Sequence, residues 1–228
     1  MLNDFFSGDL LIEIIITVIP ALICITVHEL AHGFTAYRLG DNTAKEMGRL
    51  TLNPIKHIDL VGLAMMVVFR FGWAKPVPVN MQNFKNPKWG MALTSFAGPL
   101  SNVILAFIVI FIFMLLPAPH GGLGVLFGFT EASIVGQIFI RMSILNIALA
   151  IFNMLPMPPL DGSKILFSVL PERLYYKLMK YERYGMIVLL GIMIIGMVTG
   201  RNLIAQIVMG PANLFLVHVS IFFSSLFT

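Results

Sequence analysis

A run of 26 residues without a charged side chain, from Met91 to Leu116, constrains this sequence more than any other feature. About 20 apolar residues in a helix are enough to cross the hydrocarbon core of a bilayer, which is roughly 30 Å thick. A segment in lipid must also satisfy its own backbone hydrogen bonds, and a helix does so. We therefore predict a transmembrane helix over residues 91–116.

Further apolar segments predict an all-α polytopic membrane protein with about five transmembrane helices. Hydrophobic residues make up 58% of the 228 residues and charged residues only 11%, too few to cover a water-soluble surface. The lone cysteine, Cys24, excludes an internal disulfide and a thiolate metal cluster. Because the chain has neither an internal repeat nor a polar linker, we expect a single membrane-embedded domain over residues 1–228. The expected spans are residues 10–39, 91–116, 132–156, 185–200 and 203–225.

The distribution of basic residues predicts the orientation of a multi-pass protein in the cell membrane. Of the 15 Lys and Arg, eight lie in residues 33–90 and five in residues 157–183, whereas residues 1–12 and 117–132 have none. By the positive-inside rule the two basic segments face the cytoplasm and the N-terminus lies outside. The first nine residues do not resemble a cleavable signal peptide. The net charge of +4 thus reflects topology, and no nucleic-acid partner is expected.

The segment of residues 47–81 mixes β-prone stretches with an apolar run that is too short to span a membrane. Residues 48–52 and 76–79 favour extended structure, and the apolar run covers only Val61–Phe69. We expect a small re-entrant β-hairpin element packed against the helices. A packed cytoplasmic loop is the alternative.

The sequence His28-Glu29-Leu30-Ala31-His32 within the first span predicts a zinc site. Histidines at positions i and i+4 of a helix share one face and can bind a single metal ion. Glu29, one residue round the helix, is placed to take a proton from a zinc-bound water as general base. Ionisable residues in a span are costly and usually functional, which disfavours the alternative of three polar residues merely hydrogen-bonded at a helix end.

A catalytic zinc usually takes a third protein ligand, for which Asp161 is the leading candidate. It directly follows an apolar span in a stretch with three prolines in four residues, where a carboxylate is acceptable only beside a cavity or a cation. A helix cap or an ion pair with Lys164 is the competing role. His57 and His218 remain possible ligands, whereas the charge distribution puts His120 on the opposite side of the membrane from His32.

Several motifs together resemble the site-2 protease family of intramembrane zinc proteases. They are His28 to His32, Gly98-Pro99-Leu100-Ser101-Asn102, the stretch from Asn153 to Gly162, and the segments of residues 48–59 and 71–80. The resemblance implies a three-helix catalytic core with one zinc ion per chain, held by His28, His32 and Asp161. It implies that Glu29 is the general base. It further implies that Asn102 and Asn153 lie near the site and position substrate or stabilise the oxyanion.

The expected function is hydrolysis of peptide bonds in transmembrane or membrane-associated protein substrates, within the lipid bilayer and toward its cytoplasmic side. A membrane transporter or metal-binding protein is one alternative, but the outer halves of the spans offer mainly Arg141, Gln137 and Glu13 as polar groups for an ion path. A catalytically silent family member is another alternative. An altered Glu29 would have favoured it, but the glutamate is present.

Overall fold

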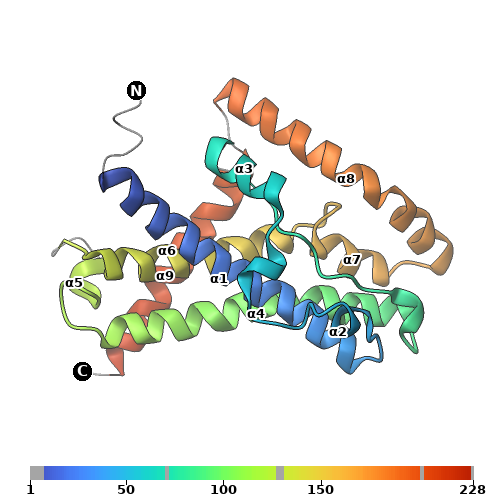
Figure 1. Cartoon of the computed structure of the whole chain (residues 1–228), viewed down its shortest axis with the longest axis horizontal. Coiled ribbons are helices and arrows are strands. Elements are labelled where there is room, and N and C mark those ends of the chain that lie inside the picture. Colours follow the sequence, from blue (N-terminus) through green and yellow to red (C-terminus); the bar gives the residue numbers. More distant parts are fainter. Residues whose placement is uncertain (1–7, 70–71, 127–130, 201–202, 227–228) are drawn as a thin grey trace. The chain divides into compact units, whose positions relative to one another are not determined.

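The structure, a computed structural model, describes residues 8–69, 72–126, 131–200 and 203–226 and is mostly helical (Figure 1). The remaining residues lie outside this description, including most of the N-terminal segment and two arginines of the charge argument, Arg70 and Arg201. The helices are α1 (Gly8–Arg38), α2 (Thr43–Glu46), α3 (Leu60–Phe69), α4 (Pro87–Leu115), α5 (Leu123–Leu126), α6 (Ile134–Asn153), α7 (Asp161–Ser168), α8 (Glu172–Thr199) and α9 (Leu203–Ser225), with short 3-10 helices at Pro54–His57 and Met81–Asn83.

Four helices in the described part of the chain are long and apolar enough to cross a membrane. They lie within α1, α4, α6 and α9, which match four of the five predicted spans. In α4 the helix begins with a proline, a residue whose fixed φ and missing N–H suit the first helical turn. These four helices indicate a membrane protein.

The predicted fifth span, residues 185–200, is not confirmed. These residues form the second half of α8, where the apolar stretch covers only Tyr184–Gly196. A helix of roughly 13 residues rises about 20 Å, well short of the roughly 30 Å of hydrocarbon. The first half of α8 carries charged side chains, so only part of this long helix is apolar. The helix ends at Gly200, whose φ of 68° is the left-handed conformation common after a helix C-terminus.

The chain divides into two compact units, and the boundaries between their residue ranges fall within α1, α4, α6 and α9. Unit one comprises Met1–Cys24, Asn102–Leu149 and Ile207–Thr228, and unit two comprises Ile25–Ser101 and Ala150–Gln206. The single metalloprotease domain expected over residues 1–228 stays a prediction.

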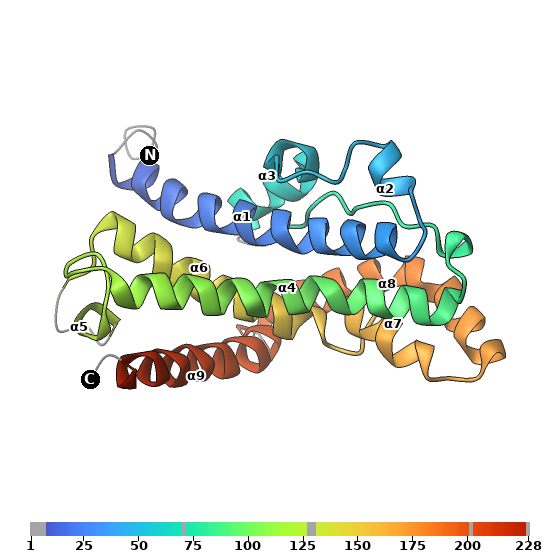
Figure 2. The same ribbon diagram turned by 90° about the horizontal axis from the view of Figure 1, so that it is seen from below.

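In unit one the second half of α4 packs against α9, and both helices are labelled in Figure 2. Ile110 of α4 is buried together with Leu216 and Val219 of α9. The rings of Phe107 and Phe215 meet edge to face, with centroids 5.2 Å apart. Helices in lipid associate through van der Waals packing of this kind, because burying apolar surface away from lipid tails brings no hydrophobic gain.

Unit two contains the segment of residues 47–81, whose described residues do not confirm the predicted β-hairpin. The apolar run is the helix α3, and a single β-bridge, between Ile58 and Ala74, is present among the described residues of this segment. Four of its nine residues, Leu63, Ala64, Met65 and Met66, favour helix, although its three valines favour strand. A helix also pairs its backbone groups internally, whereas an isolated hairpin leaves two edges unpaired.

Asp41 holds the loop after α1 to the chain that precedes α4. Its buried carboxylate accepts hydrogen bonds from the backbone N–H and hydroxyl of Thr43, the backbone N–H of Asn80 and Nδ2 of Asn83. Burial alone would raise the pKa of Asp41, but these hydrogen bonds outweigh it and lower the pKa below its usual value. The carboxylate is therefore ionised in the folded protein at neutral pH.

We expect Asp41→Asn to lower the free energy of unfolding at neutral pH by about 1–3 kcal/mol, because one of the two acceptor oxygens is replaced by an NH₂ group that cannot accept a hydrogen bond. Since the pKa is lowered by folding, the carboxylate stabilises the protein above its unfolded pKa, and this contribution is lost as the pH falls through the folded pKa. Thermal unfolding of the detergent-solubilised protein at about pH 7 and about pH 3 checks this. The difference in unfolding temperature between wild type and variant should be smaller at the acidic pH. An equal difference at both pH values would contradict the stabilising role of the ionised Asp41 carboxylate.

Candidate metal centre

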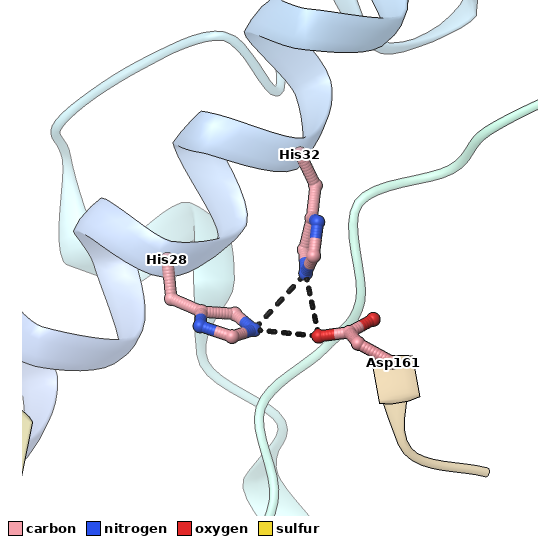
Figure 3. A group of neighbouring side chains, drawn as sticks. All are labelled: His28, His32 and Asp161. Atoms are coloured by element: carbon pink, nitrogen blue, oxygen red, sulfur yellow. Dashed lines mark hydrogen bonds and ion pairs between the residues drawn. The ribbon is translucent and has the colours of Figure 1, made fainter. Parts of the chain in front are cut away.

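His28 and His32 lie one turn apart on α1 and point to the same side of the helix (Figure 3). Both are buried, with 6% and 8% of their surface exposed. Their Nε2 atoms are 3.0 Å apart and their ring planes are nearly perpendicular, at 89°. Two ring nitrogens thus converge on one point, as the i and i+4 spacing predicts.

Asp161 reaches the same point from the first residue of α7. Its Oδ2 atom lies 3.2 Å from Nε2 of His28 and 3.2 Å from Nε2 of His32 (Figure 3). A Cβ atom at Gly162 would lie 2.2 Å from the carbonyl oxygen of Met154, so only glycine lets α7 start this close to the end of α6. The start of a helix also favours a carboxylate electrostatically.

The competing role for Asp161, an ion pair with Lys164, is not observed in the structure. The Nζ atom of Lys164 lies 3.3 Å from Oε1 of Glu182 on α8 instead. The residue before α7 is Leu160, and no side-chain hydrogen bond caps the helix. Burial alone would raise the pKa of Asp161, but the facing imidazoles of His32 and His28 outweigh it and hold the pKa well below its usual value. An ionised carboxylate is what a metal site requires.

The donor set of these three residues fits zinc. Zinc binds His nitrogen at about 2.0–2.1 Å and carboxylate oxygen at about 2.0–2.2 Å, so two ligand atoms of a tetrahedral site lie roughly 3.3–3.4 Å apart. The three separations here are 3.0, 3.2 and 3.2 Å, close to that requirement. Nδ1 of His32 lies 2.7 Å from the carbonyl oxygen of Thr94. Since a carbonyl only accepts, Nδ1 carries the proton and Nε2 keeps its lone pair for a metal.

Glu29 is held beside this group by the backbone of an extended segment. Its Oε2 accepts a hydrogen bond of 2.8 Å from the N–H of Val77. The histidines, Glu29 and Asp161 line one cavity of about 280 Å³ in unit two. The arrangement places the Glu29 carboxylate and three side-chain atoms that could bind a metal ion around a space large enough for water and part of a peptide.

Comparison with known proteins assigns the chain to a family. The model of "Peptidase family M50" matches residues 16–198. This protein belongs to peptidase family M50, the site-2 protease family.

Its relatives carry the names of zinc metalloproteases. The chain is 46% identical over 173 residues to "Putative zinc metalloprotease YwhC" of Bacillus subtilis, covering 76% of this chain and 77% of that protein. It is 26% identical over 177 residues to "Putative zinc metalloprotease Rip2" of Mycolicibacterium smegmatis, covering 76% of this chain and 64% of that protein. No solved structure matches the chain.

In this family M50 member the two asparagines of the motifs lie in different surroundings. Asn153 is the last residue of α6 and lines the cavity that contains Glu29. Asn102 is fully buried in α4, within unit one, and is not among the residues that line this cavity in the described structure. Their catalytic role stays a prediction.

The other two candidate histidines do not join the metal-binding group found among the described residues. His57 is buried, and its Nε2 lies 2.9 Å from the carbonyl oxygen of Thr51. His218 is exposed on α9, where its Nδ1 lies 2.8 Å from the carbonyl oxygen of Leu214. Both rings are hydrogen-bonded to nearby backbone.

Sequence reasoning missed the supporting contacts of Thr94 and Val77, because both act through backbone atoms. It also missed the steric role of Gly98, although the motif around it was recognised. A Cβ atom at Gly98 would lie 2.4 Å from Cε1 of His32 and 2.7 Å from Cε1 of His28. Only glycine therefore lets α4 approach the two rings this closely.

We expect Gly98→Ala to weaken zinc binding by about 10–100-fold, comparable to the loss of a residue that orients a metal ligand. The added methyl group must push aside one of the two histidine rings. Zinc per chain, measured by elemental analysis after dialysis against a graded competing chelator, tests this. Gly191→Ala on α8 is the matched control, because a Cβ atom there meets nothing within 4 Å. Equal zinc affinity in the two variants would contradict the steric role.

Proposed function

We propose that this protein is an intramembrane zinc metalloendopeptidase that cleaves transmembrane or membrane-associated protein substrates. The observation that carries the proposal is the convergence of His28, His32 and Asp161, with donor atoms 3.0–3.2 Å apart, in a cavity that Glu29 also lines. One zinc ion per chain would be held by these three side chains. When bound, it supplies a lowered water pKa and a polarised scissile carbonyl.

The remaining steps belong to the side chains. Glu29 takes a proton from the attacking water and passes it to the leaving amine of the peptide. Its hydrogen bond to the Val77 N–H orients the carboxylate, and a carboxylate retains further lone pairs for the transferred proton. Asn153, which lines the cavity, would hydrogen-bond the substrate or the developing oxyanion. For Asn102 the same role rests on the family resemblance.

The proposed setting is the cell membrane, with the N-terminus outside and the active site toward the cytoplasmic side. The abundance of Lys and Arg in residues 33–90 and 157–183 supports this orientation. His32 lies near the end of α1 that leads into the first of these basic segments.

Chelation of the purified protein tests the function. We expect the detergent-solubilised enzyme to carry about one zinc per chain and to cleave members of a panel of single-span peptides. Treatment with 1,10-phenanthroline should stop cleavage, and added zinc should restore it. Absence of bound zinc, or cleavage that survives removal of the metal, would refute the proposal. Membrane proteomics of strains with wild type and Glu29→Gln would then identify natural substrates.

A further inference from the structure

Arg49 is a buried cation next to the segment that supports Glu29. Only 6% of its surface is exposed. Its Nη2 donates a hydrogen bond of 2.7 Å to the carbonyl oxygen of Lys75, while its Nε has no partner among the described residues. Burying a guanidinium without a carboxylate partner costs free energy. The contact between Arg49 and the Lys75 carbonyl oxygen therefore suggests a functional role for this arginine.

Both backbone polar groups of Lys75 are engaged. Its N–H donates to the carbonyl oxygen of His57 at 3.0 Å, and the β-bridge between Ile58 and Ala74 anchors the preceding residue. Its carbonyl accepts the bond from Arg49. Pro76 follows, and its ring fixes its own φ and restricts Lys75 to extended backbone. A displacement of the Lys75 carbonyl should therefore also displace the backbone of Val77.

Val77 connects this rigid segment to Glu29. Its N–H donates to Glu29 Oε2 at 2.8 Å, and Pro78 restricts its backbone in turn. A Cβ atom at Gly33 would lie 2.9 Å from Cγ1 of Val77 and 2.7 Å from Cδ2 of Leu50, the neighbour of Arg49. Since Glu29 and Gly33 are one turn apart, this pair of segments packs on the face of α1 that carries Glu29.

We propose that Arg49 is a positioning residue for peptide hydrolysis. By fixing the carbonyl of Lys75 it holds the segment up to Val77, and through the Val77 amide it sets the orientation of the Glu29 carboxylate. This inference rests on the proposed function, in which Glu29 is the general base.

Arg49→Met tests the inference, because methionine keeps much of the apolar stem and removes every donor. We expect kcat to fall by about 10–100-fold, as a displacement of about 1 Å in a reacting group can cost that much. KM and the zinc content should stay within about twofold of wild type, and Arg49→Lys, which retains one donor group, should recover part of kcat. The control is Arg173→Met, which removes an exposed arginine of α8 and should leave kcat unchanged.

Two further variants separate positioning from general stability. Val77→Pro removes the N–H that contacts Glu29 and should lower kcat as Arg49→Met does. In a Glu29→Gln background neither change should lower the residual rate further, because the group they position no longer acts as a base. Loss of zinc together with kcat, or an equal loss in both backgrounds, would overturn the inference.

The outcomes distinguish failure of the proposed function from failure of the positioning role of Arg49. If wild type neither binds zinc nor cleaves, the proposed function fails. If wild type cleaves and Arg49→Met or Val77→Pro cleaves equally well, only the positioning role fails. Should Arg49→Met not yield folded protein, a normal kcat in Arg49→Lys together with a normal kcat in Val77→Pro would overturn the inference as well.

Discussion

Glu29→Gln is expected to reduce peptide cleavage by about 10²–10⁴-fold while zinc stays bound. Glutamine has nearly the same shape as glutamate, and its side-chain oxygen can still accept the hydrogen bond from the Val77 N–H. The amide cannot take a proton from the attacking water, so the loss should appear in kcat. Cleavage of a single-span peptide and zinc per chain are measured on the same preparation.

Glu46→Gln is the matched control, since it removes an exposed glutamate on α2. It should cleave at the wild-type rate. If Glu29→Gln cleaves as fast as wild type, Glu29 is not the base and the proposed mechanism is wrong. If wild type binds zinc and cleaves nothing in any assay, the silent or metal-binding alternatives gain support.

Asp161→Ala is expected to remove most of the bound zinc. Two histidines alone leave a zinc ion with too few protein ligands for a stable site. The loss of affinity should exceed the roughly 10–100-fold that removal of a ligand-orienting hydrogen bond costs. Activity should fall with the zinc content, and excess zinc in the assay should restore little of it. Asp161→Asn, which keeps the shape but loses the charge, should show an intermediate zinc affinity.

The control for Asp161→Ala is Glu172→Ala, because Glu172 is likewise an acidic residue in the first turn of a helix, α8. It tests whether loss of a carboxylate at a helix start is enough to disturb the fold. Zinc should be unchanged in that variant. Full zinc retention in folded Asp161→Ala would show that another residue supplies the third ligand.

The membrane helices were largely predictable, because the hydropathy and length of a single segment decide whether it can span a membrane. The apolar runs that contain His28 and Asn102 each proved long enough to span. The span predicted at residues 185–200 was not confirmed, because its apolar stretch is short and continues the charged first half of α8 in one helix. The hairpin predicted in residues 47–81 was not confirmed, because the apolar run between the β-prone motifs forms the helix α3, whose backbone is paired internally.

For the candidate site, sequence by itself determined that His28 and His32 share one face of a helix and that Glu29 stands beside them. These relations follow from 3.6 residues per turn and need no other part of the chain. It also singled out Asp161, because an acidic residue after a proline-rich break is costly without a partner.

Only the tertiary structure decided which distant elements meet. It brought Asp161 to within 3.2 Å of both histidines, let α4 approach them at Gly98, and set the Val77 amide against Glu29. These contacts depend on the packing of segments far apart in the chain and, at Val77, on a backbone N–H that every residue except proline carries. No residue type or spacing encodes such a contact locally, whereas the histidine motif is encoded within a single turn of helix.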